Sequence, residues 1–316
     1  MTEANSLDAT LFAFKKRDRR FVLTRATFAY LLLALALGAA YVGAIWPLLD
    51  DLFRWYIDVV HSVTKGVAPP SPPMRALMSF APWALLYTII GGLLRAAYEA
   101  ACLRWLVRQE SGGGLLGLRF SADTARVFAT YLVWIGLLLA LCIGVITFYL
   151  GVRAISAIGG PFGVIATIIG AITPLCVGAI AIWVAVRLAP AAAIIVARER
   201  FAFFGAWGVT RGRFWPLLGA FFLLIVGYFV ITSVMGQIAQ FPLQQKIAPV
   251  MVSVMSGAEL ERAFALLRQE LLTPPFLALL GVYIAAATVL ACLFRVAFFG
   301  VNARAVLAAQ EATAST

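Results

Sequence analysis

The sequence predicts an all-helical membrane protein that crosses the bilayer six times. Hydrophobic residues make up 63% of the chain and charged residues only 12%, about half the charged share of an ordinary soluble domain. The apolar residues gather in runs long enough for a helix to cross a hydrocarbon core of about 30 Å. Because unpaired backbone polar groups cannot face lipid, each run is expected to be a helix. The predicted spans are residues 27–49, 76–95, 127–150, 163–187, 214–238 and 275–295.

The regions around these spans complete the predicted organisation. Residues 1–26 form a basic amphipathic segment that we expect in the cytoplasm. Residues 27–308 are expected to form a single transmembrane domain with six helices. Residues 309–316 follow as a short cytoplasmic tail.

The distribution of positive charge predicts that both termini lie in the cytoplasm. The chain carries a net charge of +11, and with the N-terminus inside, that charge divides into about +10 on the inner side and about +1 on the outer side. An excess of Lys and Arg on the cytoplasmic side is the usual orientation signal of a membrane protein. The basic residues that fall outside in this topology are Arg54, Lys65, Arg75, Arg153, Lys246, Arg262 and Arg268.

The six spans pair into three predicted hairpins that leave and re-enter the cytoplasm. An arginine precedes each outgoing span and another follows each returning span: Arg25 and Arg95, Arg126 and Arg187, and Arg213 and Arg295. This pattern indicates a degenerate threefold repeat. The bias of basic residues toward the cytoplasm would produce the same positions without a repeat, so both interpretations remain open.

Amphipathic segments are expected at both membrane surfaces. The returning helices can continue past their arginines through residues 96–107, 188–197 and 296–308, where they either project past the membrane or bend along its surface, and Pro190 should kink the second of these. On the outer side, residues 50–65 predict one surface helix. Ser256 and Glu259 have the spacing of a capping box and predict the start of another.

Several kinds of chemistry lack the residues that they need. His61 is the only histidine, and the four cysteines (Cys102, Cys142, Cys176 and Cys292) lie in or beside apolar helices without metal-ligand spacing. The glycines that follow Ser111 lack the Gly-Lys-Ser/Thr of a phosphate-binding loop. We therefore expect no cofactor, no metal, no catalytic residues and no nucleic-acid partner.

Three arginines form the main candidate site. If the hairpins are related by pseudo-threefold symmetry, Arg95, Arg187 and Arg295 reach the same depth and can converge on a lipid phosphate, which guanidinium groups bind in a bidentate way. Arg211 and Arg213 would add to this lipid-phosphate site. In the alternative interpretation each arginine extends separately to the headgroups.

Glu99 is the one acidic residue close to a span. It lies four residues after Arg95, which places both side chains on one helix face and predicts a local ion pair. An ionisable residue within a membrane is also a functional candidate in its own right.

One stretch resembles a known family. It begins at Arg187-Leu-Ala-Pro190, continues to Glu199, and ends in Thr210-Arg-Gly-Arg213 before the next span. This order resembles a bacterial six-span membrane domain of unknown function that is sometimes fused to glycerophosphoryl diester phosphodiesterases. The match centres on residues 187–215, and residues 203–207 depart from it, since that family has more Arg and Ser there. The resemblance implies a bacterial inner-membrane location, a phospholipid context and no enzymatic activity.

The sequence therefore predicts a non-enzymatic inner-membrane protein that associates with anionic phospholipid, as a scaffold or lipid-handling factor. The alternative is a permease for a small amphiphile or anion, which would need a polar path. Few polar residues occur in the spans, among them Thr147, Thr167, Thr173, Thr232 and Ser233. A protein partner or a homo-oligomer stays open.

The topology can be tested by cysteine labelling in a variant without the four native cysteines. We expect Ser62→Cys and Ser256→Cys to react with an impermeant thiol reagent from outside, and Thr316→Cys from inside only, because of the charge asymmetry. Labelling of Ser62→Cys from the cytoplasmic side alone would contradict this topology.

Overall fold

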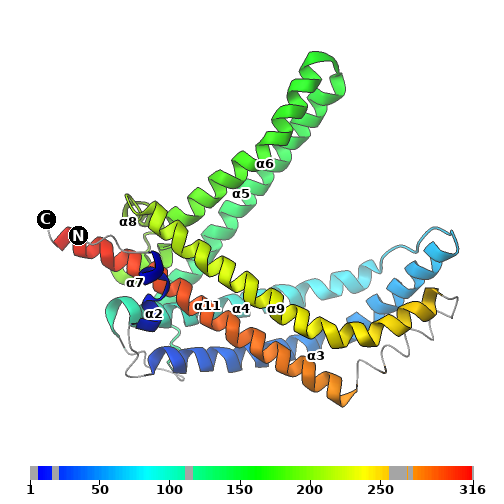
Figure 1. The fold of residues 1–316 in the computed structure, drawn as a ribbon, viewed down its shortest axis with the longest axis horizontal. Helices are drawn as coiled ribbons and strands as arrows, with labels where there is room; N and C mark the ends of the chain where they lie inside the picture. Colours follow the sequence, from blue (N-terminus) through cyan, green and yellow to red (C-terminus); the bar gives the residue numbers. More distant parts are fainter. Residues whose placement is uncertain (1–5, 16–20, 111–116, 256–268, 270–272, 315–316) are drawn as a thin grey trace. The chain divides into compact units, whose positions relative to one another are not determined.

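The fold is built from long helices, and no strand occurs among the residues that the structure describes. The computed structural model describes residues 6–15, 21–110, 117–255, 269 and 273–314. Two short helices, α1 (Ser6–Thr10) and α2 (Phe12–Lys15), precede the long helices α3 (Val22–Thr64) and α4 (Met74–Leu103), the second of which continues into a π-helical turn, η1 (Arg104–Arg108). The remaining helices are α5 (Ala122–Ile158), α6 (Gly160–Leu188), α7 (Ala191–Arg198), α8 (Gly205–Val209), α9 (Phe214–Met255) and α11 (Pro274–Ala314) (Figure 1).

The prediction of six long apolar helices is confirmed. By length and composition, six helical segments among the described residues can cross a membrane. They run over Val22–Leu48, Leu77–Arg108, Ala122–Ala157, Gly160–Arg198, Phe214–Pro242 and Pro274–Ala314. This is the architecture of a multi-pass membrane protein. The threefold repeat and the orientation of the termini stay predictions.

The helices are longer than the predicted spans. At a rise of about 1.5 Å per residue, the 43 residues of α3 extend about 65 Å, roughly twice the thickness of the hydrocarbon core. The separate outer-surface helix predicted for residues 50–65 is instead the continuation of α3, which ends at Thr64. The reason is local: helix-compatible residues follow the span without a break until Gly66, whose φ is +68°. The predicted capping box at Ser256 and Glu259 lies outside the described residues.

The described residues group into two compact units. The first contains Met1–Ala26, Ala96–Leu223 and Val296–Thr316, and the second contains Thr27–Arg95 and Leu224–Arg295. In the second unit α3 contacts α4 through the stacked rings of Tyr41 and Tyr87, whose centroids are 4.4 Å apart. In the same unit α9 contacts α11 through Tyr228 and Phe294, at 5.2 Å.

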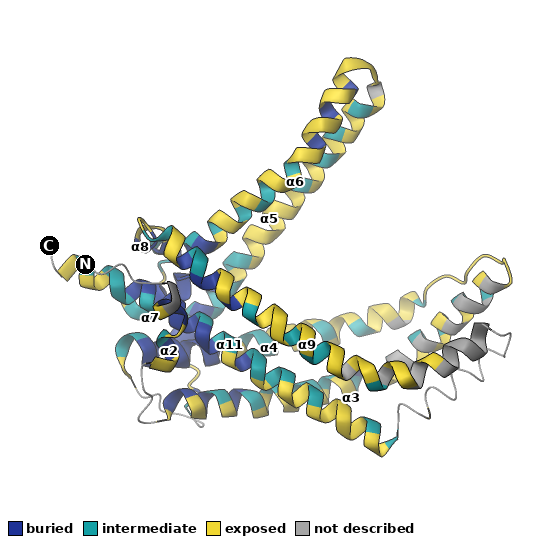
Figure 2. Cartoon of the chain, in the orientation of Figure 1, coloured by how far each residue is buried: buried dark blue, intermediate teal, exposed yellow. Residues whose placement is uncertain are grey.

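Within the first unit, α5 and α6 form an antiparallel pair (Figure 1). Gly159 and Gly160 join them with φ values of +78° and +64°, which only glycine adopts readily, and Pro161 follows inside the first turn of α6. The most apolar part of α5 has no residue buried within the protein, and Figure 2 shows both helices exposed along most of their length. These apolar faces are the surfaces that a bilayer would cover.

The buried core of the first unit lies at the other ends of these helices. Small residues dominate it: Ala96, Ala97, Ala191 and Ala193 have no exposed surface, which lets neighbouring helices approach closely. The residues of α7 from Ala191 to Val196 are all buried, and this helix contacts α5, η1 and α8. The helix continuations, predicted to project past the membrane or to bend along its surface, are buried within the first unit, and Pro190 separates α6 from α7 rather than merely kinking one helix.

Close packing of α11 against α2 makes Gly300 a sensitive position. A Cβ atom on Gly300 would lie 2.8 Å from Ala13 Cβ and 2.9 Å from the Ala13 backbone nitrogen. Gly300→Ala should therefore lower the free energy of unfolding by about 1–3 kcal/mol through overpacking. Gly281→Ala on the same helix has no atom within 4 Å of the new Cβ and should raise it by about 0.5–1 kcal/mol. Equal thermal denaturation of the two variants in detergent micelles would contradict this packing.

Candidate functional site

Arg187 lies in the last turn of α6, and three aromatic rings surround it. The guanidinium carbon is 5.8 Å from the centroid of the Trp183 ring, 5.7 Å from that of Trp207 and 5.7 Å from that of Phe214. Trp183 comes from the preceding turn of α6, Trp207 from α8 and Phe214 from the start of α9. Each ring lies close enough for its π-electrons to attract the cation, and Arg187 itself is half-buried. We call these four residues the Arg187 cage.

Thr210 holds the cage together. Arg187 Nη1 donates to the carbonyl oxygen of Thr210 at 3.0 Å, and Thr210 Oγ1 lies 3.2 Å from the carbonyl oxygen of Arg187. Thr210 has no exposed surface, and its hydroxyl also reaches the carbonyls of Ala206 at 3.0 Å and Trp207 at 3.2 Å, so its single proton always has an acceptor. The contact ties the end of α6 to the end of α8, where helical carbonyls lack partners within their own helix.

The guanidinium of Arg187 keeps unused hydrogen-bonding capacity. It carries five N–H donors, of which one serves Thr210, and its Nε is buried without a partner. A hollow of about 630 Å³ opens beside it, lined by one arginine and six apolar or aromatic side chains: Ala179, Ile182, Trp183, Arg187, Phe214, Trp215 and Leu218. A cation with spare donors in an apolar surrounding favours an anionic group that carries an apolar body.

Two other predicted site residues follow α8 in the same unit. Arg213 donates from Nη2 to the carbonyl oxygen of Ala308 at 2.8 Å, near the C-terminal end of α11. That bond gives Arg213 a role in joining α9 to α11. Arg211 is exposed and makes no ion pair within the described part of the chain. Of these two, Arg211 is the one with its guanidinium available to a ligand.

The other predicted residues fall into different surroundings. Arg295 donates to the hydroxyl of Tyr30, and its guanidinium carbon is 5.5 Å from the centre of that ring. Arg95 is exposed, and Glu99 is buried and accepts a hydrogen bond from the Tyr131 hydroxyl. Arg95 and Arg295 belong to one compact unit, and Arg187 belongs to the other. Convergence of the three arginines and the Arg95–Glu99 ion pair stay predictions.

A second polar cluster, centred on Arg108, lies in the first unit. Its Nη1 donates to the carbonyl oxygen of Val196 at 3.2 Å and to Glu199 Oε1 at 2.7 Å. Its Nη2 donates to Glu110 Oε2 and to Asp123 Oδ2, each at 2.9 Å. The two terminal nitrogens carry four N–H groups, and all four find acceptors. Arg108 thereby caps the last turn of α7. It also joins that turn to Glu110, which follows η1, and to Asp123 in the first turn of α5.

Neighbouring charges complete the Arg108 cluster. Asp123, in the first turn of α5, also accepts from Arg126 Nη1 at 2.9 Å. Arg104 is buried and donates from Nη1 to Ser121 Oγ at 3.0 Å. Arg108 and Arg126 pair with the carboxylate of Asp123, which is buried, whereas the other two carboxylates bound by Arg108, those of Glu110 and Glu199, are exposed. The pairing compensates the buried charge of Asp123, which would be costly if it were left unpaired.

The backbone around Arg108 is unusual in two places. Residues 104–108 form a π-helical turn, a feature that occurs often at functional sites. Gln109 and Glu199, which end η1 and α7, both adopt left-handed conformations, with φ of 59° and 52°. Non-glycine residues adopt this region at some cost, which the bonds of Arg108 to Val196 and Glu199 offset.

Comparison of the chain with protein-family models, with curated proteins and with solved structures finds no match. The resemblance over residues 187–215 therefore stays a prediction. In the described part of the chain, no group of three or more His, Cys, Asp or Glu side chains has the geometry of a metal site. The class that the fold defines is thus an all-helical, multi-pass membrane protein, and the Arg187 cage is its most distinctive site.

Sequence reasoning identified Arg187 but missed its partners. Trp183 was within reach of the argument, because a residue four positions earlier lies on the same helix face. The other partners are Trp207, Thr210 and Phe214. Their spacing in the sequence does not reveal that their segments pack against the end of α6. The Arg108 cluster was missed for the same reason, since Arg108 and Glu199 are 91 positions apart.

The Arg108 cluster predicts a difference between two acidic residues. The Asp123 side chain is 8% exposed and accepts bonds from two arginines, whereas Glu311, paired with Arg304, is 65% exposed. Asp123→Asn should therefore lower the free energy of unfolding by about 2–3 kcal/mol, because it leaves guanidinium groups without a matching charge. Glu311→Gln should change it by less than about 1 kcal/mol. Equal midpoints of thermal denaturation would show that the cluster contributes nothing to stability.

Proposed function

We propose that this protein is a non-enzymatic membrane protein that binds an anionic phospholipid, with the headgroup phosphate at the Arg187 cage. One observation carries the proposal: a guanidinium with spare donors, held by three aromatic rings, stands at the edge of an apolar hollow. Guanidinium forms bidentate hydrogen bonds with phosphate, and the apolar lining suits the glycerol and first methylene groups of a lipid. Arg211 is close by in sequence and can add attraction for anionic headgroups.

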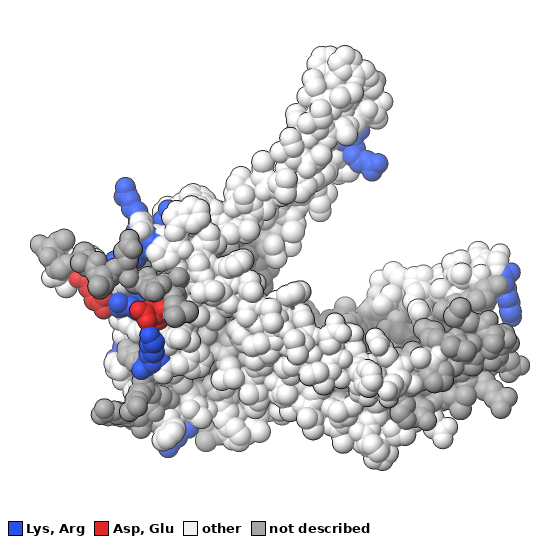
Figure 3. Space-filling view, viewed as in Figure 1, with Lys and Arg blue, Asp and Glu red and all other residues white. Residues whose placement is uncertain are grey.

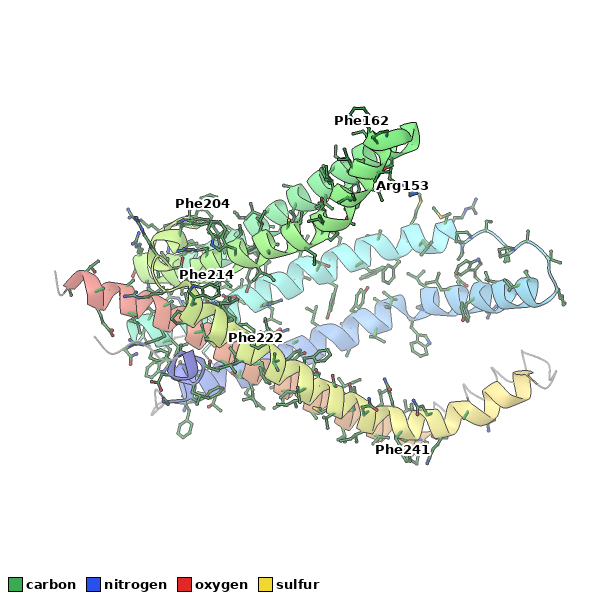
Figure 4. The ribbon with its side chains drawn as sticks, turned by 45° about the horizontal axis from the view of Figure 1, so that its top comes forward. Arg153, Phe162, Phe204, Phe214, Phe222 and Phe241 are labelled. Carbon is green, nitrogen blue, oxygen red and sulfur yellow. The ribbon has the colours of Figure 1, made fainter. Side chains whose placement is uncertain are left out.

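The charge distribution supports a position of this site at the cytoplasmic face. Basic groups gather at the ends of α5 and α6 that lie beside α7 and α8, whereas the surface along the pair is free of charge until near the turn (Figure 3). Figure 4 labels Arg153 and Phe162 near that turn, and Phe204 and Phe214 at the opposite end. We therefore propose a bacterial inner-membrane protein with both termini inside, which acts as a scaffold or lipid-handling factor.

The hydroxyl groups in the spans support lipid binding over the permease alternative. Thr167 donates to the carbonyl oxygen of Gly163 at 2.9 Å, and Thr173 donates to that of Ile169 at 2.7 Å. Thr232 likewise donates to Tyr228 at 2.7 Å. Each hydroxyl is satisfied within its own helix, so these residues do not need a polar path beside them.

Native mass spectrometry of purified protein with added anionic phospholipid tests the proposal. Arg187→Ala removes both the positive charge and the planar guanidinium group. The loss of two charge-assisted hydrogen bonds to the phosphate should weaken lipid binding roughly 100-fold. Arg187→Lys keeps the positive charge but loses the planar guanidinium group and its contacts with the aromatic rings. The affinity for the lipid should therefore fall about tenfold. Arg153→Ala, an exposed arginine near the α5–α6 turn, should bind lipid like the wild type.

A further variant separates ligand binding from folding. Arg187→Ala also removes the hydrogen bond to Thr210, so a loosened α8 would by itself reduce lipid binding in this variant. Leu218→Trp fills the hollow from α9 and leaves that bond in place, so it should reduce lipid retention at unchanged thermal stability. Retention by Arg187→Lys equal to that of the wild type would contradict the proposed site and leave only a general attraction of basic residues to membranes.

A further inference from the structure

A second hollow lies between α5 and α6 in the same compact unit as the Arg187 cage. It has a volume of about 600 Å³, and its walls include Ala140, Gly144 and Phe148 from α5 and Ile169, Thr173 and Cys176 from α6. The hydroxyl of Thr173 donates its hydrogen bond to the carbonyl oxygen of Ile169, so the surface that faces the hollow is apolar. We call this hollow the α5–α6 groove.

The groove and the cage lie along one face of α6. Ile169, Cys176 and Trp183 are each seven residues apart, and Arg187 follows Trp183 by four. With 3.6 residues per turn, these spacings return to the same side of the helix. A ligand that contacts Arg187 and extends along this face toward the α5–α6 turn therefore reaches the groove.

The distances fit one leaflet of a bilayer. At about 1.5 Å per residue, Cys176 lies about 16 Å and Thr173 about 21 Å from Arg187 along the helix axis. A bilayer of about 40–45 Å including headgroups allows each lipid about 20 Å from headgroup to chain end. A phospholipid whose phosphate binds Arg187 thus places the distal half of an acyl chain against Cys176 and Thr173.

We propose that the Arg187 cage and the α5–α6 groove are the two ends of one site, which holds a single anionic phospholipid with one acyl chain along α6. This inference rests on the proposed function and adds to it the path of the chain. The chemistry of the two ends indicates the occupant. The positive charge of the Arg187 cage favours an anionic group, and the apolar groove favours an acyl chain. Because surrounding lipid is as apolar as the groove, the groove contributes close packing and order rather than a hydrophobic gain.

Photo-crosslinking tests the chain path directly. The probe is a phosphatidylglycerol with a diazirine near the end of one acyl chain, added to the full-length protein in nanodiscs, with adducts mapped by mass spectrometry. In the wild type we expect adducts concentrated at groove residues such as Cys176, at least fivefold over Cys142, which is exposed on α5 but does not line the groove. Arg187→Ala should remove this preference.

Matched glycine variants on α5 distinguish the groove from the cage. A side chain on either Gly144 or Gly136 meets no atom within 4 Å of its Cβ, but only Gly144 lines the groove. Gly144→Leu should abolish the groove adducts, whereas Arg187→Ala should abolish both the groove adducts and the lipid retention in native mass spectra. Gly136→Leu should change neither measurement.

The outcomes separate the two proposals. Lipid retention that depends on Arg187, together with adducts spread evenly over α5 and α6, would overturn the shared site and leave the proposed function standing. Absence of Arg187-dependent retention would overturn both. Groove adducts that persist in Arg187→Ala would show that the groove takes chains of bulk lipid independently of the cage, which also overturns the shared site.

Discussion

The break between helices α6 and α7 at Pro190 is the constraint on which the first compact unit depends. Proline has no backbone N–H to donate within a helix, and at Pro190 α6 has ended at Leu188 and α7 begins at Ala191, whereas Pro174 lies inside α6 without interrupting it. The break lets α7 turn into the interior, where its residues from Ala191 to Val196 are buried. It also leaves the carbonyl of Arg187 available to the Thr210 hydroxyl, and that contact brings α8 and its tryptophan against the guanidinium. One proline thus connects the core with the cage.

In the first unit, the stabilising interactions differ between the exposed length of α5 and α6 and the buried ends of these helices. Along the exposed length of α5 and α6, apolar faces would meet lipid, and lipid provides no hydrophobic drive for helices to associate. Beyond those faces, small residues such as Ala96 and Ala193 allow close approach of backbones, and Arg108 connects η1, α5 and α7 through charge-assisted bonds. Specific packing is therefore concentrated at the helix ends that carry the basic residues, which is also where the Arg187 cage lies.

The two arginine clusters differ in what remains available to a ligand. Arg108 places all four terminal N–H groups on protein acceptors and is only 15% exposed, so it acts as a structural connection. Arg187 gives one bond to Thr210, lies within about 6 Å of three aromatic ring centroids and adjoins a hollow. The same residue type has opposite roles because one guanidinium is surrounded by carboxylates and the other by rings. Aromatic rings stabilise the cation without occupying its donors.

The sequence by itself determined the helical class, the six apolar helices and the importance of Arg187 at an inner helix end, because these follow from local hydropathy and from charge next to each span. It also predicted a kink at Pro190, the position at which the structure separates α6 from α7. Only the tertiary structure decided that the continuations after the spans are buried, and that Trp207, Thr210 and Phe214 gather around Arg187. Those contacts join segments far apart in sequence, and local periodicity carries no information about which segments meet.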